Sequence, residues 1–231
     1  MRHPLDRPAW SALSGRQHRF AVGDGAALRF DPEVGPFAAV GTDDDDSLAL
    51  LAGLVRRTGR SVLLQRGPVP PVPGVAERLR APGVQLVLDR LADVPDLAPE
   101  HEPVELGLSD AAEMVALARL TEPGPFEART PELGGFLGIR DPASGELVAM
   151  AGQRMQPAGH TEVSGVCTHP DHRGKGFAAA LSAAVARRIL ARGDTPFLHA
   201  YAGNRPAIAL YERLGFVHRA DVEVVALEPA G

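Results

Sequence analysis

The chain has 231 residues, of which 45% are hydrophobic and 23% charged, and this composition is typical of a globular protein with a buried core. Its net charge of −5 argues against nucleic acid or an anionic membrane as the main partner. The single cysteine, Cys167, excludes a disulfide framework and a cysteine-based zinc site, and no apolar run reaches the about 18 residues of a membrane span. We therefore expect a cytoplasmic protein with no metal, membrane or nucleic-acid partner.

Residues 1–98 predict an α/β half in which no catalytic residue is recognisable. The four aspartates of residues 43–46 precede apolar residues at helical spacing, so they predict a helix N-terminus, where the helix dipole favours acids. A metal site is the less favoured alternative, because adjacent carboxylates point in different directions. Residues 75–80 predict a short helix. Apolar runs predict strands at residues 26–30, 36–40, 61–65 and 84–88.

A stretch rich in proline and acidic residues, 91–103, predicts a linker. We therefore expect two domains, residues 1–98 and 101–231. In the second, a helix with Met114 and Leu117 on its buried face is expected after the first strand. Strands are predicted at residues 104–108, 136–140, 146–154, 161–168 and 196–200.

The most informative stretch, residues 160–192, predicts a strand, a basic glycine-rich turn and a long helix. Two glycines in the turn allow left-handed backbone, and the first N–H groups of the helix have no partner within it. Arg173 and Lys175, the only lysine of the chain, add positive charge. Together these features predict an anion site for a phosphate or diphosphate. The alternative is a glycine-rich connector with solvated charges.

Two common phosphate motifs do not fit this turn. A Walker A loop requires glycine where His169 stands and serine or threonine after the lysine, where the chain has Gly176. A dinucleotide fold requires an acidic residue at the end of the next strand, but Asp194 lies before that strand.

The residues Arg173 to Ala178 match the pattern [QR]-x-x-G-x-[GA]. A second run, from Asn204 through Tyr211 to Phe216, follows it as N-x-x-A-x-x-x-Y-x-x-x-G-F. With both motifs in this order, residues 101–225 resemble the GNAT superfamily of N-acetyltransferases. The resemblance implies an α+β fold in which helices flank a mostly antiparallel central sheet with two splayed strands. We interpret the N-terminal half as a partial or degenerate copy of the same architecture.

The resemblance also implies acetyl-CoA as the co-substrate, with its diphosphate on the turn from Gly174 to Ala178. Tyr211 is then the expected general acid that protonates the leaving thiolate, and its alternative role is packing. Asn204 is expected to contact the pantetheine arm or only to cap its helix. Gly165 would suit a bulge in the splayed strand. The implied coenzyme contacts are Val166, Cys167, Thr168, Arg173, Gly174, Lys175, Gly176, Phe177, Ala178, Asn204 and Tyr211.

The expected reaction is direct attack of a primary amine on the thioester, which needs a proton acceptor. Glu162 is the first choice for this base, because family members often use a carboxylate on this strand; a solvent-facing strand residue is the alternative. His160 and His169 are further titratable candidates. The acceptor is expected beside Phe126, Glu127 and Arg129, unless these residues form only a solvated loop.

Several alternatives stay open at this stage. Cys167 and His169 could act as nucleophile and base of a ping-pong mechanism, although a lone cysteine in a strand is usually a core residue. The protein could also bind acyl-CoA without catalysis. The acceptor could be a small-molecule or peptide amine, and a homodimer is possible.

Overall fold

The computed structural model describes residues 3–95 and 97–230, and residue 96 of the predicted linker lies outside this range. Its strands form one sheet in the order β1-β2-β3-β4-β11-β5-β10-β9-β8-β7-β6. Only the neighbours β3/β4 and β9/β10 are parallel, so the predicted mostly antiparallel sheet is confirmed. The strands are β1 (Ala21–Asp24), β2 (Ala27–Phe30), β3 (Phe37–Val40), β4 (Ser61–Arg66), β5 (Val75–Leu88), β6 (Val104–Leu106), β7 (Phe136–Arg140), β8 (Leu147–Gln153), β9 (His160–Thr168), β10 (Thr195–Tyr201) and β11 (Phe216–Pro229).

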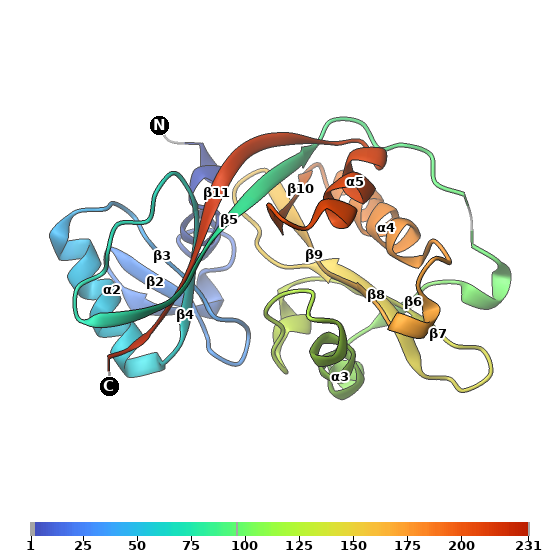
Figure 1. Ribbon diagram of the computed structural model, residues 1–231, viewed down its shortest axis with the longest axis horizontal. Helices are drawn as coiled ribbons and strands as arrows, with labels where there is room; N and C mark the ends of the chain where they lie inside the picture. The colour runs from blue at the N-terminus through green and yellow to red at the C-terminus, as the bar shows by residue number, and fades with distance from the viewer. Residues whose placement is uncertain (1–2, 96, 231) are drawn as a thin grey trace.

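Helices cover both faces of this sheet (Figure 1). Helix α4 buries Leu181, Val185 and Ile189 against one face of β7, β8 and β9, while α3 buries Met114 and Leu117 against the other face. In the N-terminal half, α2 packs on the same sheet from the side opposite to α1. The helices are α1 (Pro8–Leu13), α2 (Asp45–Thr58), α3 (Ala111–Thr121), α4 (Phe177–Ala191) and α5 (Arg205–Arg213).

The fold repeats one unit twice. Each half contains two parallel strands joined by a helix, β3-α2-β4 in the first and β9-α4-β10 in the second. The next strand of the sheet then comes from the other half: β11 lies beside β4, and β5 lies beside β10. These two strands have 14 residues each and run antiparallel to one another along the middle of the molecule (Figure 1). The expected repeated architecture is therefore confirmed, while the division at residues 1–98 and 101–231 stays a prediction, because the strands of the two halves are interleaved.

The helix predicted at residues 75–80 is wrong, because these residues form the first half of β5. Up to Pro82, β5 pairs only with β11, and the pairing with β10 begins at Gly83. A proline is tolerated at such a place, since one side of the strand needs no ladder hydrogen bond. The partner that makes this segment a strand lies about 150 residues further along the chain, so local pattern could not reveal it.

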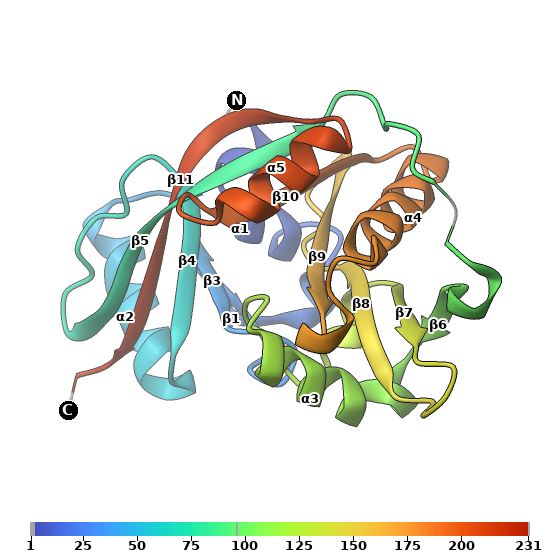
Figure 2. The same ribbon diagram turned by 45° about the vertical axis from the view of Figure 1, so that its right-hand side comes forward.

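The parallel strands β9 and β10 pair over three residues only and then part. Their last paired row joins Glu162 to Phe197. Beyond it, the ladder between β8 and β9 is shifted around Gly165, whose φ of +65° is left-handed. A side chain there would also collide with Phe136, since a Cβ would lie 2.9 Å from its ring. The predicted splayed strands and the bulge at Gly165 are thus confirmed, and Figure 2 shows the two strands diverging.

The corresponding gap in the N-terminal half is filled by the chain itself. Arg7 donates a hydrogen bond to the carbonyl oxygen of Val40 at 2.9 Å and pairs with Asp43. The indole of Trp10 covers Gly41, where a Cβ would lie 2.9 Å from the ring. The parallel strands part after a short ladder in both halves, but in the N-terminal half Arg7 and Trp10 fill the space between them.

Candidate functional site

The turn before α4 offers unused backbone donors. Gly174 and Gly176 have φ angles of +79° and +81°, and a Cβ on either would meet no atom within 4 Å. Among the described residues, none accepts a hydrogen bond from the N–H groups of residues 174–179. The side chains of Arg173 and Lys175 are exposed beside them. The predicted features of an anion site are thus present together: open N–H groups, a helix N-terminus and two cations.

The parted strand β9 continues this row of open backbone groups. His169 donates to the Val148 carbonyl at 2.8 Å, and the register pairs Cys167 with Met150. Because alternate residues of an antiparallel strand bond to the same neighbour, the backbone groups of Val166 and Thr168 face away from β8, toward the gap left by β10. The Thr168 hydroxyl is also buried without a partner among the described residues.

The side chain of Cys167, by contrast, points into the core between β8 and α3. Burial raises the pKa of its thiol to about 11, so the reactive thiolate is scarce near neutral pH. These surroundings do not favour the alternative of a nucleophilic cysteine.

Helix α5 closes the other side of the gap. Asn204 caps it, since its side-chain oxygen accepts a hydrogen bond from the N–H of Ala207 at 3.2 Å. Tyr211 follows two turns later and is only 8% exposed. Burial raises the pKa of its hydroxyl to about 12, with a small contribution from nearby Cys167. Its hydroxyl has no hydrogen-bond partner among the described residues, so its proton is available to a ligand in the gap.

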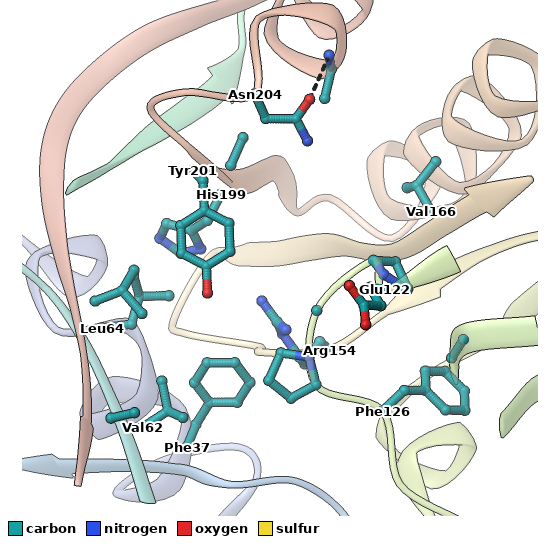
Figure 3. A pocket seen from close by; sticks show the side chains of 18 of the residues that line it. Phe37, Val62, Leu64, Glu122, Phe126, Arg154, Val166, His199, Tyr201 and Asn204 are labelled. Carbon is teal, nitrogen blue, oxygen red and sulfur yellow. Dashed lines mark hydrogen bonds between the residues drawn. The ribbon is translucent and has the colours of Figure 1, made fainter. Parts of the chain in front are cut away.

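A cleft of about 650 Å³ extends from this gap across the sheet (Figure 3). Both halves of the chain line it. The C-terminal half contributes residues of β9, β10 and α5 and the loop after α3, and the N-terminal half contributes one wall from β3, β4 and β11. This wall is formed by Phe37, Val62, Leu64, Val222, Val224 and Ala226.

A buried ion pair lies at the floor of the cleft, at the row where β9 and β10 part. Glu162 is completely buried and accepts two hydrogen bonds from Arg154, at 2.9 Å and 2.7 Å, and one from the Nδ1 of His199 at 2.7 Å. Burial alone would raise the pKa of this carboxyl, but the charge and hydrogen bonds of Arg154, helped by His199, outweigh it and lower the pKa to about 2. So weak a base, with its oxygens already engaged, does not suit the role of proton acceptor predicted for Glu162.

Both ring nitrogens of His199 have hydrogen-bond partners. Its Nδ1 must donate to the carboxylate, so Nε2 is the acceptor, and that atom lies 2.9 Å from the side-chain nitrogen of Gln85. The Gln85 amide is fixed in turn, because its oxygen accepts from Arg219 at 2.7 Å. Arg219 is the extra residue of a bulge in β11, and it also contacts Asp6. This polar network joins four neighbouring strands and engages both ring nitrogens of His199.

The loop after α3 reaches the cleft only in part. Phe126 lines the cleft and packs edge-on against Phe136, with 5.5 Å between ring centroids. Glu127 is exposed and does not line the cleft. Arg129 is occupied by ion pairs with Glu132 and with Asp31 and Glu33 of the N-terminal half. Of the three predicted acceptor contacts, the structure therefore brings only Phe126 to the cleft.

Several cleft residues escaped the sequence analysis. Arg154 follows β8, Tyr201 ends β10, and Glu122 follows α3 with a left-handed φ of +50°. Neither a motif nor a periodicity marks them, and the wall from the N-terminal half depends on long-range strand pairing. The one local indication concerned Glu122, which stands directly before Pro-Gly-Pro. Such a sequence ends a helix and so predicts that Glu122 lies at the start of a loop.

Within residues 3–95 and 97–230, no group of three or more histidine, cysteine or acidic side chains is arranged to hold a metal ion. No helix in the same part of the chain has the length and apolar character needed to cross a membrane.

The ion pair of Glu162 predicts a loss of stability in acid. An ordinary glutamate has a pKa of about 4.5, so the lowered pKa stabilises the fold above that pH and the stabilisation disappears as pH falls toward 2. We expect this group to contribute about 3 kcal/mol to the fall in the free energy of unfolding over this range, measured by urea titration. Glu162→Gln should be destabilised at neutral pH by about 3–5 kcal/mol and show less acid dependence. Glu113→Gln, which removes a surface partner of Arg140, is the control; equal acid profiles in both variants would contradict the prediction.

Comparisons with known proteins agree with this geometry. The FR47-like protein family matches residues 136–225, which span β7 to β11. A crystal structure of a protein of the GNAT acetyltransferase family from Novosphingobium aromaticivorans DSM 12444 is 42% identical, with a TM-score of 0.89 and 100% of both chains covered. No curated protein matched the sequence.

Two more distant structures share the fold. A GCN5-related N-acetyltransferase from Kribbella flavida is 21% identical, with a TM-score of 0.69 over 98% of this chain and 96% of that one. A tandem GNAT protein from the clavulanic acid biosynthesis pathway is 16% identical, with a TM-score of 0.55 over 89% of this chain and 78% of that one. The full-length match at 42% identity decides the assignment: this chain belongs to the GNAT family of acetyltransferases.

Proposed function

We propose that the protein transfers the acetyl group of acetyl-CoA directly to a primary amine. In this reaction a nitrogen–carbon bond forms, the carbon–sulfur bond breaks, the amine loses a proton and the leaving thiolate gains one. Family membership supports acyl transfer in general. The observation that carries the specific proposal is the gap between β9 and β10, which has open backbone groups along one side and continues into a cleft past Tyr211.

The backbone around the gap suits the coenzyme. The N–H groups from Gly174 to Ala178, with Arg173 and Lys175 beside them, would hold the diphosphate, and Phe177 anchors the start of the helix in the core. The backbone groups of Val166 and Thr168 would pair with the pantetheine amides as an added strand would. Asn204 and Tyr211 would lie along the other side, and Cys167 would contribute only its backbone position.

Tyr211 is the proposed general acid. Because its pKa is about 12, its hydroxyl stays protonated at neutral pH and can give a proton to a leaving thiolate. The hydroxyl is free of other partners within the described chain, and Tyr211 lines the cleft.

Glu122 is the proposed proton acceptor in place of Glu162. It is the one carboxylate among the described residues that lines the cleft, and no ion pair or side-chain hydrogen bond within the described chain occupies it. Its left-handed backbone at the end of α3 places an exposed acid at the cleft rather than along the helix surface. It could take the proton directly or through water.

Tyr211→Phe removes the proposed acid with little change in volume. We expect kcat to fall about 10- to 100-fold and the Kd for CoA to change less than threefold, measured by thiol release and by calorimetry. Ser144→Ala, which removes a hydroxyl from the exposed turn before β8 and away from the cleft, is the control and should keep the kcat of the unmodified protein. Coenzyme binding without thiol release on any amine, in the unmodified protein, would instead indicate a non-catalytic acyl-CoA-binding protein.

Glu122→Gln tests the proton acceptor. We expect kcat to fall by about 100-fold, because the amide cannot accept the amine proton. Glu113→Gln, on the outer surface of the same helix, should keep the activity of the unmodified protein. Turnover that is equal in both variants would show that the proton leaves by another route.

A further inference from the structure

The charged side chains that line the cleft indicate what kind of acceptor it can bind. Three arginines line it, Arg60, Arg119 and Arg154, against the single carboxylate of Glu122. Arg60 and Arg119 are exposed and make no ion pair within the described residues. Since Arg154 is balanced by Glu162, the cleft keeps an excess of positive charge, although the whole chain carries a net charge of −5. A surplus of cations in a cleft of an acidic protein favours an anionic group on its ligand.

Arg154 has one side of its guanidinium left for such a group. Its Nε and Nη2 atoms bond to the Glu162 carboxylate, and Nη1 has no partner among the described residues. The guanidinium lies over the Phe37 ring, 4.3 Å from its centroid, so stacking and the ion pair together fix its plane. The side chain is 12% exposed and lines the cleft, and Figure 3 shows it beneath the hydroxyl of Tyr201, with Phe37 beside it.

An arginine held in this way differs from a surface cation. It is fixed before the ligand arrives, partly desolvated, and directs its Nη1 donors at one position. A carboxylate at that position would accept hydrogen bonds from Arg154 and could accept another from Tyr201. The apolar wall of β4 and β11 beside it, including Leu64 and Val224, would suit a hydrocarbon body.

From this arrangement we infer that the acceptor amine also carries a carboxylate, as an amino acid with an apolar side chain does. Arg154 binds the carboxylate, and Glu122 faces the amine. This inference rests on the proposed function and specifies its acceptor.

Matched pairs of amines test it, each pair differing only in the carboxylate. L-leucine is compared with 3-methylbutylamine, and L-phenylalanine with 2-phenylethylamine, at equal concentrations of the neutral amine form. Thiol release from acetyl-CoA is measured. We expect kcat/KM to be higher by about tenfold or more for the amino acid of each pair, because the carboxylate gains charge-assisted hydrogen bonds.

Arg154→Lys assigns the effect to Arg154. Lysine keeps a positive charge beside Glu162 but loses the guanidinium donors, so we expect KM for the amino acids to rise by about tenfold with KM for the matching amines nearly unchanged. Arg140→Lys, which alters a surface pair with Asp110 and Glu113, is the control for the substitution itself. If Arg154→Lys does not fold, Arg119→Gln provides a second variant, which should lower the preference for amino acids without loss of stability.

The outcomes separate the two claims. Equal use of both members of each pair, or of the amine alone, would overturn the carboxylate inference and leave acetyl transfer to amines intact. Bound acetyl-CoA with no thiol release from either member would also overturn it. Failure to bind acetyl-CoA would instead overturn the proposed function itself.

Discussion

The place where β9 and β10 part is fixed by the buried ion pair of Arg154 and Glu162. Glu162 belongs to the last row that joins the two strands, and its carboxylate also holds His199 on the partner strand. Breaking such a buried pair by removing one partner typically costs about 3–5 kcal/mol. The pair therefore ties the strands together at one row, and the gap proposed to bind the coenzyme can open beyond that row without loosening the sheet. It also orients Arg154 at the floor of the cleft, so one interaction supports both the gap and the proposed acceptor site.

The two halves have diverged around a common plan. In the C-terminal half the gap is open and leads to a basic, glycine-rich turn. In the N-terminal half Arg7 and Trp10 fill the equivalent place, and the helix there begins with aspartates 44–46, which would repel a diphosphate. Instead, this side of the sheet forms a wall of the cleft, through the exchanged strand β11 and its neighbour β4. Because of the exchange of β5 and β11, the apolar wall of the cleft and the gap between β9 and β10 belong to one sheet.

Local sequence patterns were sufficient to predict those elements whose conformation is set by residues close by in the sequence. The long helix of residues 177–191, the cap at Asn204 and the left-handed glycines of the turn are all set by neighbours within a few positions. The glycine-rich turn and its helix could therefore be predicted from the residues, whereas the splayed strands were expected only from the resemblance to the GNAT superfamily. Residues 75–80 were assigned to a helix because their partner strand lies at the other end of the chain.

Local sequence patterns also failed to predict the surroundings of the residues expected to contact the acceptor. Glu162 was expected to serve as a base, but its environment is made by Arg154 and His199, which reach it from other strands. Arg129 was expected in the cleft, yet carboxylates of the N-terminal half bind it elsewhere. Burial and charge pairing across a sheet depend on which strands become neighbours, and a single sequence does not contain that information in any local pattern.

The central claim is that the open backbone groups of the C-terminal half receive the coenzyme. Residue-resolved amide hydrogen exchange with and without CoA tests it most directly. Our account predicts slower exchange on CoA addition at Val166 and Thr168 and in the turn from Gly174 to Ala179, with no change at Val40 in the filled N-terminal gap. Unchanged exchange at all of these C-terminal amides under saturating CoA, or protection in the N-terminal half instead, would contradict it.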